Sequence, residues 1–381
     1  MSAKERASRS GEVPYYGASG QVGWIDKPLF DEPLLLLGED GVQFFDPAKS
    51  KAYVIDGPAW VNNHAHVLRA RHDLVERRFL VYYLNWTDFH GFANGTTRLK
   101  LTKSAMTSMP IPLPSLDEQR RIIEILEDHL SRLDAAQSLL STARTRLEAY
   151  KASVRDVGVT GGAGRVSVGA DLPPGWRWAS VEEFADSAKG SMTIGPFGSN
   201  LKVIDYRASG VPLVFVRNVR TAAFGRVGCR YVTPEKAAEL RAHGVEPGDV
   251  VVTKMGAPPG DAAVYRADGP GVVTADVIRI RPAACVDPDY LALALNSGLV
   301  RQQIADITRG VAQQKVSLAR YRSEVLVPTP AFDAQAAVAI ACAEDLAAAS
   351  RVETATRALE VKLSALKRSL LAAAFSGRLV S

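Results

Sequence analysis

Cysteine is scarce in this sequence: Cys229, Cys285 and Cys342 are the only three among 381 residues, and no two of them form a C-x-x-C pair. Zinc sites and disulfide frameworks use several cysteines at short, regular spacings. The sequence therefore predicts neither kind of site. A chain that does not depend on disulfides suits a reducing compartment, and we expect it to work in the cytoplasm.

Long hydrophobic runs are also missing. No apolar stretch approaches the ~18 residues that a membrane-spanning helix needs. The N-terminal segment "MSAKERASRSGE" carries basic residues without the apolar stretch of a secretory signal. We therefore expect no membrane partner.

The short motifs of common catalytic sites are absent as well. No G-x-S-x-G sequence is present, so a hydrolase with that nucleophile motif is not predicted. His64 and His66 alternate along an extended segment, but no third ligand accompanies them, and we predict no metal site. No residue is assigned a catalytic role.

What the sequence does contain is a moderate excess of basic residues. The net charge is +5 and the isoelectric point is about 9.0. Residues 157–330 hold 20 Lys and Arg against 16 Asp and Glu, and so contribute most of this excess. Such a balance permits binding to nucleic acid without requiring it.

Glycines near the N-terminus raise a different possibility. In "VPYYGASGQVGWID", Gly17, Gly20 and Gly23 have the G-x-x-G-x-x-G spacing of some dinucleotide-binding loops. Such a loop needs a buried strand before it and a helix after it, whose N-terminus holds the pyrophosphate. Pro14 predicts a poor central strand, and Pro28 prevents a following helix. We interpret the glycines as turn residues; an NAD(P)-dependent reductase is the alternative that tight NAD(P)H binding would support.

A long helix is predicted over residues 115–157, after a proline-rich segment. Ser115 is a good N-cap, and Glu118 three residues later completes a capping box. Apolar residues then recur every seven positions in two rows, with His129 as a polar exception, and this pattern predicts a coiled-coil seam. The rows are Leu126, Leu133, Leu140, Leu147 and Val154, and Ile122, Ala136, Ala143 and Tyr150.

A second long helix is predicted over residues 331–377, with Gly377 as its C-terminal stop. It also carries two heptad rows, and we expect the rows of both helices to be core. The rows of the second helix are Val352, Leu359, Leu366 and Ala373, and Leu363 and Leu370.

The segments before the two helices are alike, which indicates an internal duplication. "IPLPSLDEQ" (111–119) aligns with "VPTPAFDAQ" (327–335), and Gly95 and Lys100 match Gly310 and Lys315. Because the matches keep the same order along the chain, they predict two equivalent domains. Three further pairs are "LLLGEDG" (35–41) with "VVVTKMG" (250–256), "AHVLR" (65–69) with "ADVIR" (275–279), and "YYLN" (82–85) with "LALN" (293–296).

The predicted fold class is α+β, with two globular domains that are each followed by a long helix. Strand-like runs broken by Gly and Pro fill the globular parts, and short helices are expected at 73–85 and 288–306. The predicted bounds are 1–114 for the first domain, 115–157 for its helix, 158–172 for a linker, 173–330 for the second domain and 331–377 for the closing helix.

Several segments together resemble the specificity subunits of Type I restriction–modification enzymes. "PYYGASGQVGWIDKPLFDEPLLLLGEDG", "WVNNHAHVL" and "GTTRLKLTKSAMTSMPIPLPSLDEQRRI" are similar to a first target recognition domain and its exit. "GPFGSNLKVIDY", "VPLVFVRNV", "DVVVTKMGAPPGDAAVY" and "LKRSLLAAAFSGRLV" are similar to a second domain and the closing helix. The resemblance implies that each domain recognises one half of a bipartite DNA site. It also implies that the two helices pack as an antiparallel coiled coil, which serves as a spacer and a docking surface.

The resemblance further implies partners. A non-catalytic subunit of this kind directs two methyltransferase subunits, and through them restriction subunits, to double-stranded DNA in the bacterial cytoplasm. S-adenosylmethionine, ATP and Mg²⁺ would bind those partners and not this chain. The target sequence, the half-site spacing and the methylated base are not predicted.

One departure from the family pattern concerns the first domain. The second domain opens with "PPGWRWASVEEFAD", and members of the family usually have a similar opening in both domains. Either the start is misassigned or the first domain lacks its first strand and helix. The alternative function is accordingly a methyltransferase-binding scaffold whose shortened first domain no longer recognises DNA.

Recognition of DNA requires cations for phosphates and bidentate side chains for base edges. We therefore select polar residues in loops and at strand ends. In the first domain the candidates are Tyr16, Ser19, Gln21, Asn62, Asn63, His64, Thr97, Arg98 and Lys100. In the second domain they are Asn200, Lys202, Arg217, Asn218, Arg220, Lys254, Arg309, Gln313, Gln314 and Lys315.

Overall fold

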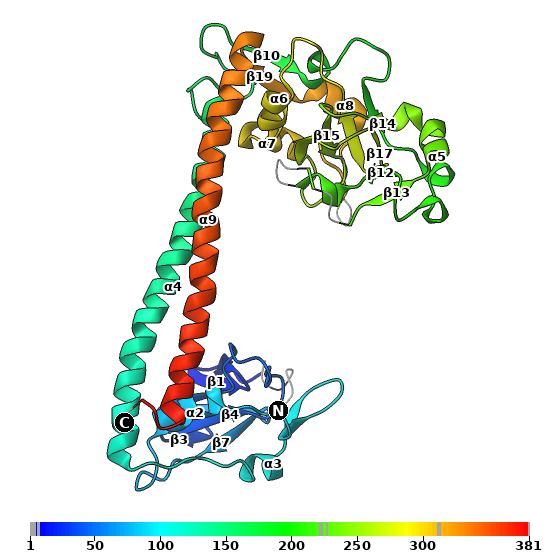
Figure 1. Ribbon diagram of the computed structural model, residues 1–381. Coiled ribbons are helices and arrows are strands. Elements are labelled where there is room, and N and C mark those ends of the chain that lie inside the picture. The colour runs from blue at the N-terminus through cyan, green and yellow to red at the C-terminus, as the bar shows by residue number, and fades with distance from the viewer. Residues whose placement is uncertain (1–4, 6–7, 221–223, 226–227, 311–313, 380–381) are drawn as a thin grey trace. The chain divides into compact units, whose positions relative to one another are not determined.

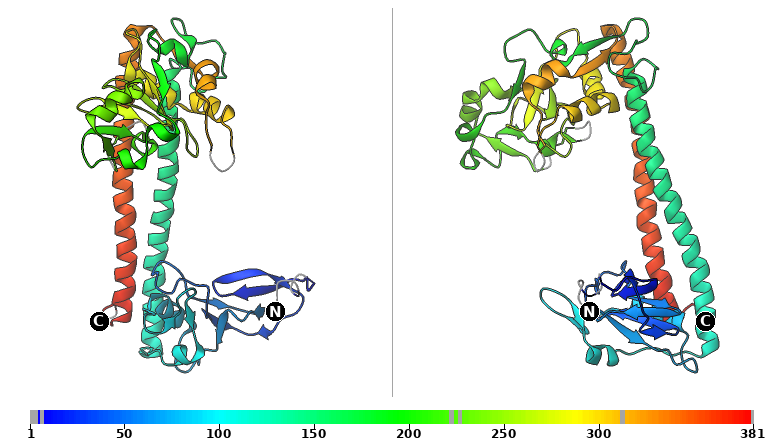
Figure 2. Two further views of the ribbon diagram at one scale, coloured as in Figure 1. Left: turned by 90° about the vertical axis from the view of Figure 1, so that its right-hand side faces the viewer. Right: turned by 180° about the vertical axis from the view of Figure 1, so that it is seen from behind.

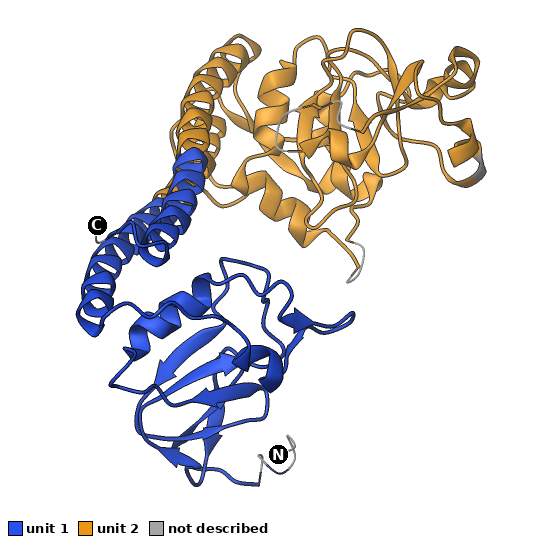
Figure 3. Cartoon of the chain, turned by 60° about the horizontal axis from the view of Figure 1, so that its bottom comes forward, with its two compact units in different colours: residues 1–142, 356–381 blue, residues 143–355 orange. Residues whose placement is uncertain are grey.

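The computed structural model describes residue 5 and residues 8–220, 224–225, 228–310 and 314–379. The chain divides into two compact units, residues 1–142 with 356–381, and residues 143–355 (Figure 3). Two helices of 44 residues each, α4 (Leu116–Val159) and α9 (Phe332–Phe375), pass through both units (Figure 1). The α+β class with two long helices is confirmed.

The first unit contains a four-stranded sheet in the order β2-β1-β6-β3 and a three-stranded sheet in the order β5-β4-β7. A short pair, β8 with β9, and the helices α2 (Arg77–Trp86) and α3 (Lys103–Thr107) complete it. The strands are β1 (Val13–Gly17), β2 (Gly20–Ile25), β3 (Phe30–Asp31), β4 (Leu34–Gly38), β5 (Ala52–Ile55), β6 (Pro58–Val61), β7 (Ala65–Leu68), β8 (Ala93–Asn94) and β9 (Lys100–Leu101).

Strand β4 shows why an unbroken apolar run occurs in this unit. Successive side chains of a strand point to opposite faces of the sheet. Leu35 and Leu37 pack into a cluster with residues of α2, whereas Leu34 and Leu36 pack into a second cluster with Ile55 and other residues of the neighbouring strands. Both faces of β4 are therefore covered, and a sequence of four consecutive leucines is the result.

The second unit contains two four-stranded sheets, β13-β12-β17-β14 and β11-β18-β15-β16, and a two-stranded sheet of β10 with β19. Its helices are α5 (Pro234–Glu239), α6 (Pro288–Leu295), α7 (Gly298–Asp306) and α8 (Leu318–Glu324). The strands are β10 (Arg177–Ser180), β11 (Met192–Ile194), β12 (Val211–Val214), β13 (Arg230–Val232), β14 (Gly244–Val245), β15 (Val250–Thr253), β16 (Ala262–Val264), β17 (Gly271–Val273), β18 (Val277–Ile280) and β19 (Leu326–Thr329).

The short helix expected at 288–306 is two helices, α6 and α7. The break falls at Ser297, whose hydroxyl accepts a hydrogen bond from the Val300 N–H at 3.4 Å and so caps α7. A serine inside a helical pattern favours a cap because its side chain competes for backbone donors.

The duplication is visible in equivalent hydrogen bonds of the two units. The Asn85 amide brackets the backbone of Ala52, accepting from its N–H at 2.9 Å and donating to its carbonyl at 2.9 Å. Asn296 brackets Ala262 in the same way, at 3.2 and 2.7 Å. The match of "YYLN" with "LALN" therefore corresponds to one structural position in each unit.

One proposed match has the wrong register. Leu35 pairs with Leu68 in the first unit, and Val250, the equivalent of Leu35, pairs with Ile280 in the second. Leu68 thus corresponds to Ile280, whereas the alignment of "AHVLR" with "ADVIR" had placed it opposite Ile278. The error is two residues, so it left each side chain on the correct face of its strand.

The long helices pack against each other within each unit, and they run in opposite directions (Figures 1 and 2). In the first unit Ile122 and Leu126 near the start of α4 share a cluster with Leu370 and Ala374 near the end of α9. In the second unit Lys151 near the end of α4 forms an ion pair with Glu353 of α9.

The predicted capping box at the start of α4 is present: the Ser115 N–H donates to the Glu118 carboxylate at 3.1 Å, and the Glu118 N–H donates to the Ser115 hydroxyl at 3.3 Å.

The heptad rows are only partly core. On α4, Leu126 is fully buried, but Tyr150 is 47% exposed and Ala143 is exposed. The prediction that the Val352 row of α9 is buried in the core is wrong. Val352, Leu359 and Leu366 are each about half exposed, because another face of α9 packs against α4. That buried face carries small and polar residues, Cys342, Ala349 and Thr356, followed in heptad step by Leu363 and Leu370.

The N-terminal glycines form a β-hairpin. Gly17 pairs with Gly20 across a two-residue turn, and β2 follows where a dinucleotide loop would have a helix. Pro14 was expected to make this segment a poor central strand, yet β1 lies between β2 and β6. The strand tolerates Pro14 because β6 pairs only with Tyr15 and Tyr16.

Candidate nucleic-acid interface

In the first unit, four short segments place polar side chains at one edge of the sheet that contains β4. The chain beyond β4 meets β9, where Asp40 bridges to Lys100 and the Leu101 N–H donates to the Glu39 carbonyl at 2.7 Å. Asn62 lies beside Gly17 of the hairpin, and the Tyr53 hydroxyl donates to the Gly17 carbonyl at 2.5 Å. The turn at 17–20, Asn62–His64, Glu39–Asp40 and Arg98–Lys100 are thus neighbours.

Two carboxylates neutralise the cations at this edge. The Asp40 carboxylate lies 2.6 Å from the Arg98 guanidinium and 2.9 Å from Nδ1 of His64. The Glu39 carboxylate lies 2.8 Å from Nζ of Lys100, and this hydrogen bond holds the pKa of Lys100 above its usual value. Arg98 and Lys100 are more than half exposed, so a phosphate can reach them in competition with these carboxylates.

The other predicted residues of the first unit differ in accessibility. Ser19 is exposed at the hairpin turn, and Asn63 and Thr97 are exposed as well. Gln21 is exposed and donates to the Gly23 carbonyl at 3.2 Å. Tyr16 is half-buried, and its ring centroid lies 6.0 Å from that of Tyr53. The side-chain oxygen of Asn62 accepts from the His64 N–H at 2.9 Å and thereby shapes the loop.

The second unit repeats this edge with different charges. Met255 bridges to Lys315 as Asp40 does to Lys100, and the Val316 N–H donates to the Lys254 carbonyl at 3.1 Å as Leu101 does to Glu39. Glu39 and Asp40 therefore correspond to Lys254 and Met255. A lysine and a methionine replace the two acids, so this edge of the second unit is the more cationic of the two.

Four predicted residues of the second unit converge here. Lys254 lies over the Phe197 ring, 5.1 Å from its centroid, and the ring is 62% exposed. Arg309 and Lys315 are exposed and exchange backbone hydrogen bonds at 3.0 and 2.9 Å. Gln314 is half-buried, and its carbonyl accepts from the Gly256 N–H at 3.3 Å. Gln313 lies outside the described residues.

The remaining predictions fall on two other loops. The prediction that Asn218 reads a base is wrong, because this residue is only 1% exposed. Its side-chain oxygen accepts from the Phe215 N–H and its side-chain nitrogen donates to the Gly225 carbonyl, both at 2.9 Å. Arg217 is exposed, but its guanidinium lies over the Phe215 ring and donates to the Gly228 carbonyl. Arg220 is exposed, and so are Asn200 and Lys202.

Sequence reasoning missed the acidic partners and the aromatic one. Glu39, Asp40 and Phe197 were not selected, although "GED" aligned with "TKM" already shows the reversal of charge between the two units. Phe197 could have been noticed as an aromatic residue in a Gly-rich segment. Its approach to Lys254, 57 residues later, is a property of the fold.

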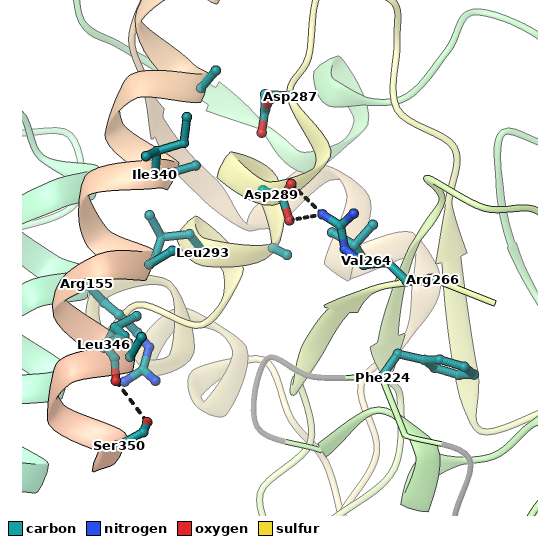
Figure 4. A pocket seen from close by; sticks show the side chains of 15 residues that line it. Arg155, Phe224, Val264, Arg266, Asp287, Asp289, Leu293, Ile340, Leu346 and Ser350 are labelled. Carbon is teal, nitrogen blue, oxygen red and sulfur yellow. Dashed lines mark hydrogen bonds and ion pairs between the residues drawn. The ribbon is translucent and has the colours of Figure 1, made fainter. Parts of the chain in front are cut away.

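A hollow of about 720 Å³ lies elsewhere in the second unit, between α9, α6 and β16 (Figure 4). Its wall is largely apolar, with Leu293 and Ile340 among the lining residues. Its carboxylates already have structural partners: Asp289 pairs with Arg266 at 2.5 Å, and Asp287 accepts from the Tyr290 N–H and caps α6. We therefore assign it no part in nucleic-acid binding.

In the described part of the chain, no group of three His, Cys, Asp or Glu residues is placed to hold a metal ion. None of the helices in the described ranges is long and apolar enough to cross a membrane.

Comparisons with known proteins agree on one family. Residues 1–141 match the Type I restriction modification DNA specificity domain. Over 121 residues the chain is 36% identical to a Haemophilus influenzae protein named as a type I restriction enzyme specificity subunit; the match covers 31% of this chain and 30% of that relative. Over 341 residues it is 21% identical to the EcoBI specificity subunit of Escherichia coli, and the match covers 85% of this chain and 70% of that relative.

Solved structures share the fold. A chain studied for complex assembly and conformational transition of the type I R-M system matches with a TM-score of 0.75 and 18% identity, over 98% of this chain and 93% of that one. The HsdS subunit from Thermoanaerobacter tengcongensis matches with a TM-score of 0.55 and 19% identity, over the same shares of the two chains.

Proposed function

We propose that the chain is a member of the family of Type I restriction–modification specificity subunits and that it recognises a bipartite DNA site on behalf of methyltransferase and restriction subunits. In this proposal each unit contacts one half-site. The continuous helices α4 and α9 then fix the number of base pairs between the half-sites.

The observation that carries the proposal is the pair of equivalent edges, each of which presents an exposed lysine. Lys100 and Lys315 occupy the same position of the duplicated fold, and both are exposed. Lysine and arginine neutralise phosphates, which supplies most of the affinity for DNA, whereas neighbouring polar side chains read base edges. Ser19, Gln21 and Asn63 in the first unit, and Gln314 in the second, are the neighbours available for that role.

Joining two weak recognition units explains how such a chain could be selective. Each half-site offers few base contacts, but binding of one unit raises the effective concentration of the other. The discrimination energies of the two half-sites then add, provided that their spacing is correct.

Docking of partners is supported by the exposed face of α9. Leu359 and Leu366 are 48% and 56% exposed, and Val352 lies one heptad earlier on the same face. An apolar row on a long helix is an ordinary surface for packing against other helices. We propose that two methyltransferase subunits use the long helices in this way, in the bacterial cytoplasm. S-adenosylmethionine, ATP and Mg²⁺ would then belong to the methyltransferase and restriction subunits.

The test is to co-express the chain with its methyltransferase subunit in a host without other adenine methylation, and to sequence the DNA by a method that detects modified bases. We expect methylation at one split motif. Assembly of the complex without any methylated motif would favour the scaffold alternative. Tight binding of NAD(P)H by the purified chain would contradict both.

A further inference from the structure

Phe197 is an exposed aromatic residue at the cationic edge of the second unit. Its side chain is 62% exposed, and Nζ of Lys254 lies over its ring, 5.1 Å from the centroid. The Lys254 carbonyl accepts from the Val316 N–H, so the loop that carries Arg309 and Lys315 lies beside Lys254. The edge therefore presents a flat apolar surface together with several cations.

Two more apolar side chains follow in the same segment. Val203 and Ile204 are 79% and 80% exposed, so with Phe197 three large apolar side chains face solvent within eight positions of the chain. A single exposed apolar residue is common on a protein surface, but a group of them indicates a surface that another molecule covers. Lys202 and Arg207, which flank the pair, are exposed as well.

The backbone of this segment is fixed at both ends. The Gly195 N–H donates to the Thr274 carbonyl at 3.3 Å, and a Cβ atom at Gly195 would collide with the backbone of Val273 and Thr274. At the other end Arg207 exchanges backbone hydrogen bonds with Tyr231 at 2.7 and 3.2 Å. The apolar side chains are therefore presented by an ordered segment, and binding to them loses little conformational entropy of the backbone.

Each group of apolar side chains lies at a turn that its own hydrogen bonds close. Gly198 follows Phe197 with a φ of +57°, which favours glycine, and the Asn200 N–H donates to the Phe197 carbonyl at 3.3 Å. At the second turn the Lys202 N–H donates to the Asp205 carboxylate at 2.7 Å, and the Asp205 N–H donates to the Lys202 carbonyl at 2.9 Å. Local hydrogen bonds thus hold both turns in the conformation that exposes these side chains.

We propose that this segment deforms the DNA of the half-site that the second unit contacts, and that the Phe197 ring is a wedge that enters between two base pairs. The inference rests on the proposed function and deepens it. The faces of stacked bases are the flat apolar surface of DNA, and phenylalanine is one of the side chains that proteins insert between them. Lys254, which lies over the ring, neutralises a phosphate beside the opened base step.

A wedge of this kind adds sequence selectivity that hydrogen bonds to base edges do not supply. Pyrimidine–purine steps unstack and kink more easily than other steps, so the energy of deformation depends on the sequence that is deformed. Phe197 therefore favours a flexible step in one half-site.

The charges of the segment favour DNA over a protein as the molecule that covers it. Lys202, Arg207 and Lys254 lie next to the apolar residues in the sequence or in space. Asp205 is the only acid between residues 197 and 207, and its carboxylate already accepts from the Lys202 N–H. Apolar side chains among cations complement a polyanion that carries apolar bases between its phosphates.

The first test selects preferred sequences from random duplex DNA, with the full parent chain and with Phe197→Ala. We expect the parent chain to enrich a split motif. Phe197→Ala should keep the preference of one half-site and lose about tenfold of the preference at a single base step of the other, as expected for loss of one ring that stacks on a base. Phe197→Leu keeps an apolar wedge and should retain most of that preference.

The second test measures unstacking directly with 2-aminopurine, a base analogue whose fluorescence is quenched by stacking. Placed beside the selected step, it should brighten several-fold when the parent chain binds at saturation, and should stay dark with saturating Phe197→Ala. Phe332→Ala is the control, because it removes a phenylalanine that is 49% exposed at the start of α9. It should leave the selected motif and the fluorescence unchanged. Since Phe197 is mostly exposed, its variants should keep the thermal unfolding midpoint of the parent chain.

The outcomes separate the wedge from the proposed function. If the parent chain enriches a split motif and Phe197→Ala enriches it equally well, the wedge is overturned and the proposed function stands. If the parent chain enriches no motif, both are overturned.

Two further outcomes would overturn the wedge by assigning Phe197 another contact. Replacement of thymine by deoxyuridine tests the methyl group that a ring can also touch in the major groove. A loss equal to that of Phe197→Ala, with 2-aminopurine dark, would show that the ring contacts this methyl group. Unchanged DNA selection by Phe197→Ala with loss of the methyltransferase subunit in co-purification would show that a protein covers the ring.

Discussion

Lys100 and Lys315 occupy the same position in the two units but have different surroundings. Glu39 pairs with Lys100, whereas Lys254 stands at the place of Glu39 near Lys315. A phosphate must displace a carboxylate from Lys100 and need not do so at Lys315. The two edges therefore have the same backbone geometry but a different net charge, and a phosphate would be attracted more strongly to the edge of the second unit.

The first prediction concerns Lys315. Lys315→Ala should weaken binding of non-specific duplex DNA several-fold and reduce the slope of log affinity against log salt by about 1, as expected for one lost phosphate contact. Fluorescence anisotropy over a salt series measures both. Arg351→Ala makes the same change of charge at an exposed position of α9, and an equal loss there would show that net charge alone is responsible.

The second prediction concerns the acid of the first unit. Glu39→Gln should raise the affinity for duplex DNA at low salt a few-fold, because Lys100 no longer has a competing carboxylate. Glu127→Gln removes the same charge from an exposed pair with Arg78 and is the control. An unchanged affinity in Glu39→Gln would place Lys100 outside the DNA contact.

At the scale of elements, each long helix is joined to its globular part by a buried glutamine. Gln119 is 0% exposed, and its amide donates to the Leu74 and Pro114 carbonyls, both at 2.9 Å. Gln335 joins α9 to the globular part of the second unit in the same way, and its side-chain oxygen accepts from the Asp287 N–H at 2.9 Å. Since buried polar groups cost most when they lose their partners, these contacts fix where each helix leaves its domain.

Gln119→Ala should therefore lower the free energy of unfolding by about 2 to 3 kcal/mol, because it strands a buried N–H and two carbonyls. Chemical denaturation followed by circular dichroism measures the loss. Gln137→Ala makes the same substitution at an exposed position of the same helix and should change stability little. Equal effects of the two variants would mean that helix propensity decides the result.

The exposed apolar row of α9 is the second feature at this scale. Replacing both Leu359 and Leu366 by Ser should abolish co-purification with the methyltransferase subunit and leave the thermal unfolding of the chain nearly unchanged, because both residues are about half exposed. Leu29→Ser with Leu74→Ser alters two comparably exposed leucines away from α9 and is the control. Retention of the methyltransferase by the α9 variant would move docking to another surface.

At the scale of the whole molecule, α4 and α9 are the only elements that belong to both units of the described chain. Inserting one heptad after Gln137 in α4 and one after Leu363 in α9 keeps the packed faces in step. The insertion lengthens each helix by about 10 Å, which corresponds to about three base pairs of DNA. We expect the methylated motif to keep its two half-sites and to gain up to that many base pairs between them, as read by modification-sensitive sequencing. An unchanged spacing would show that the helices do not set it.

The sequence by itself determined the features that depend on neighbours along the chain. Apolar runs predicted the strands, the Ser115 capping box predicted the start of α4, and Gly377 predicted the end of α9. The duplication was also visible, since equivalent positions keep equivalent residues such as Gln119 and Gln335. These signals are local because backbone geometry, capping and the alternation of faces are local.

Only the tertiary structure decided which surfaces those elements present. Heptad spacing cannot tell that Cys342 and Ala349 face α4 while Leu359 faces outward, because several faces of α9 are apolar. A strand-end asparagine has the same sequence signature whether it is exposed or, as Asn218, buried. The pairing of Glu39 with Lys100 and the approach of Lys254 to Phe197 depend on contacts between distant segments, and packing in three dimensions alone selects those contacts.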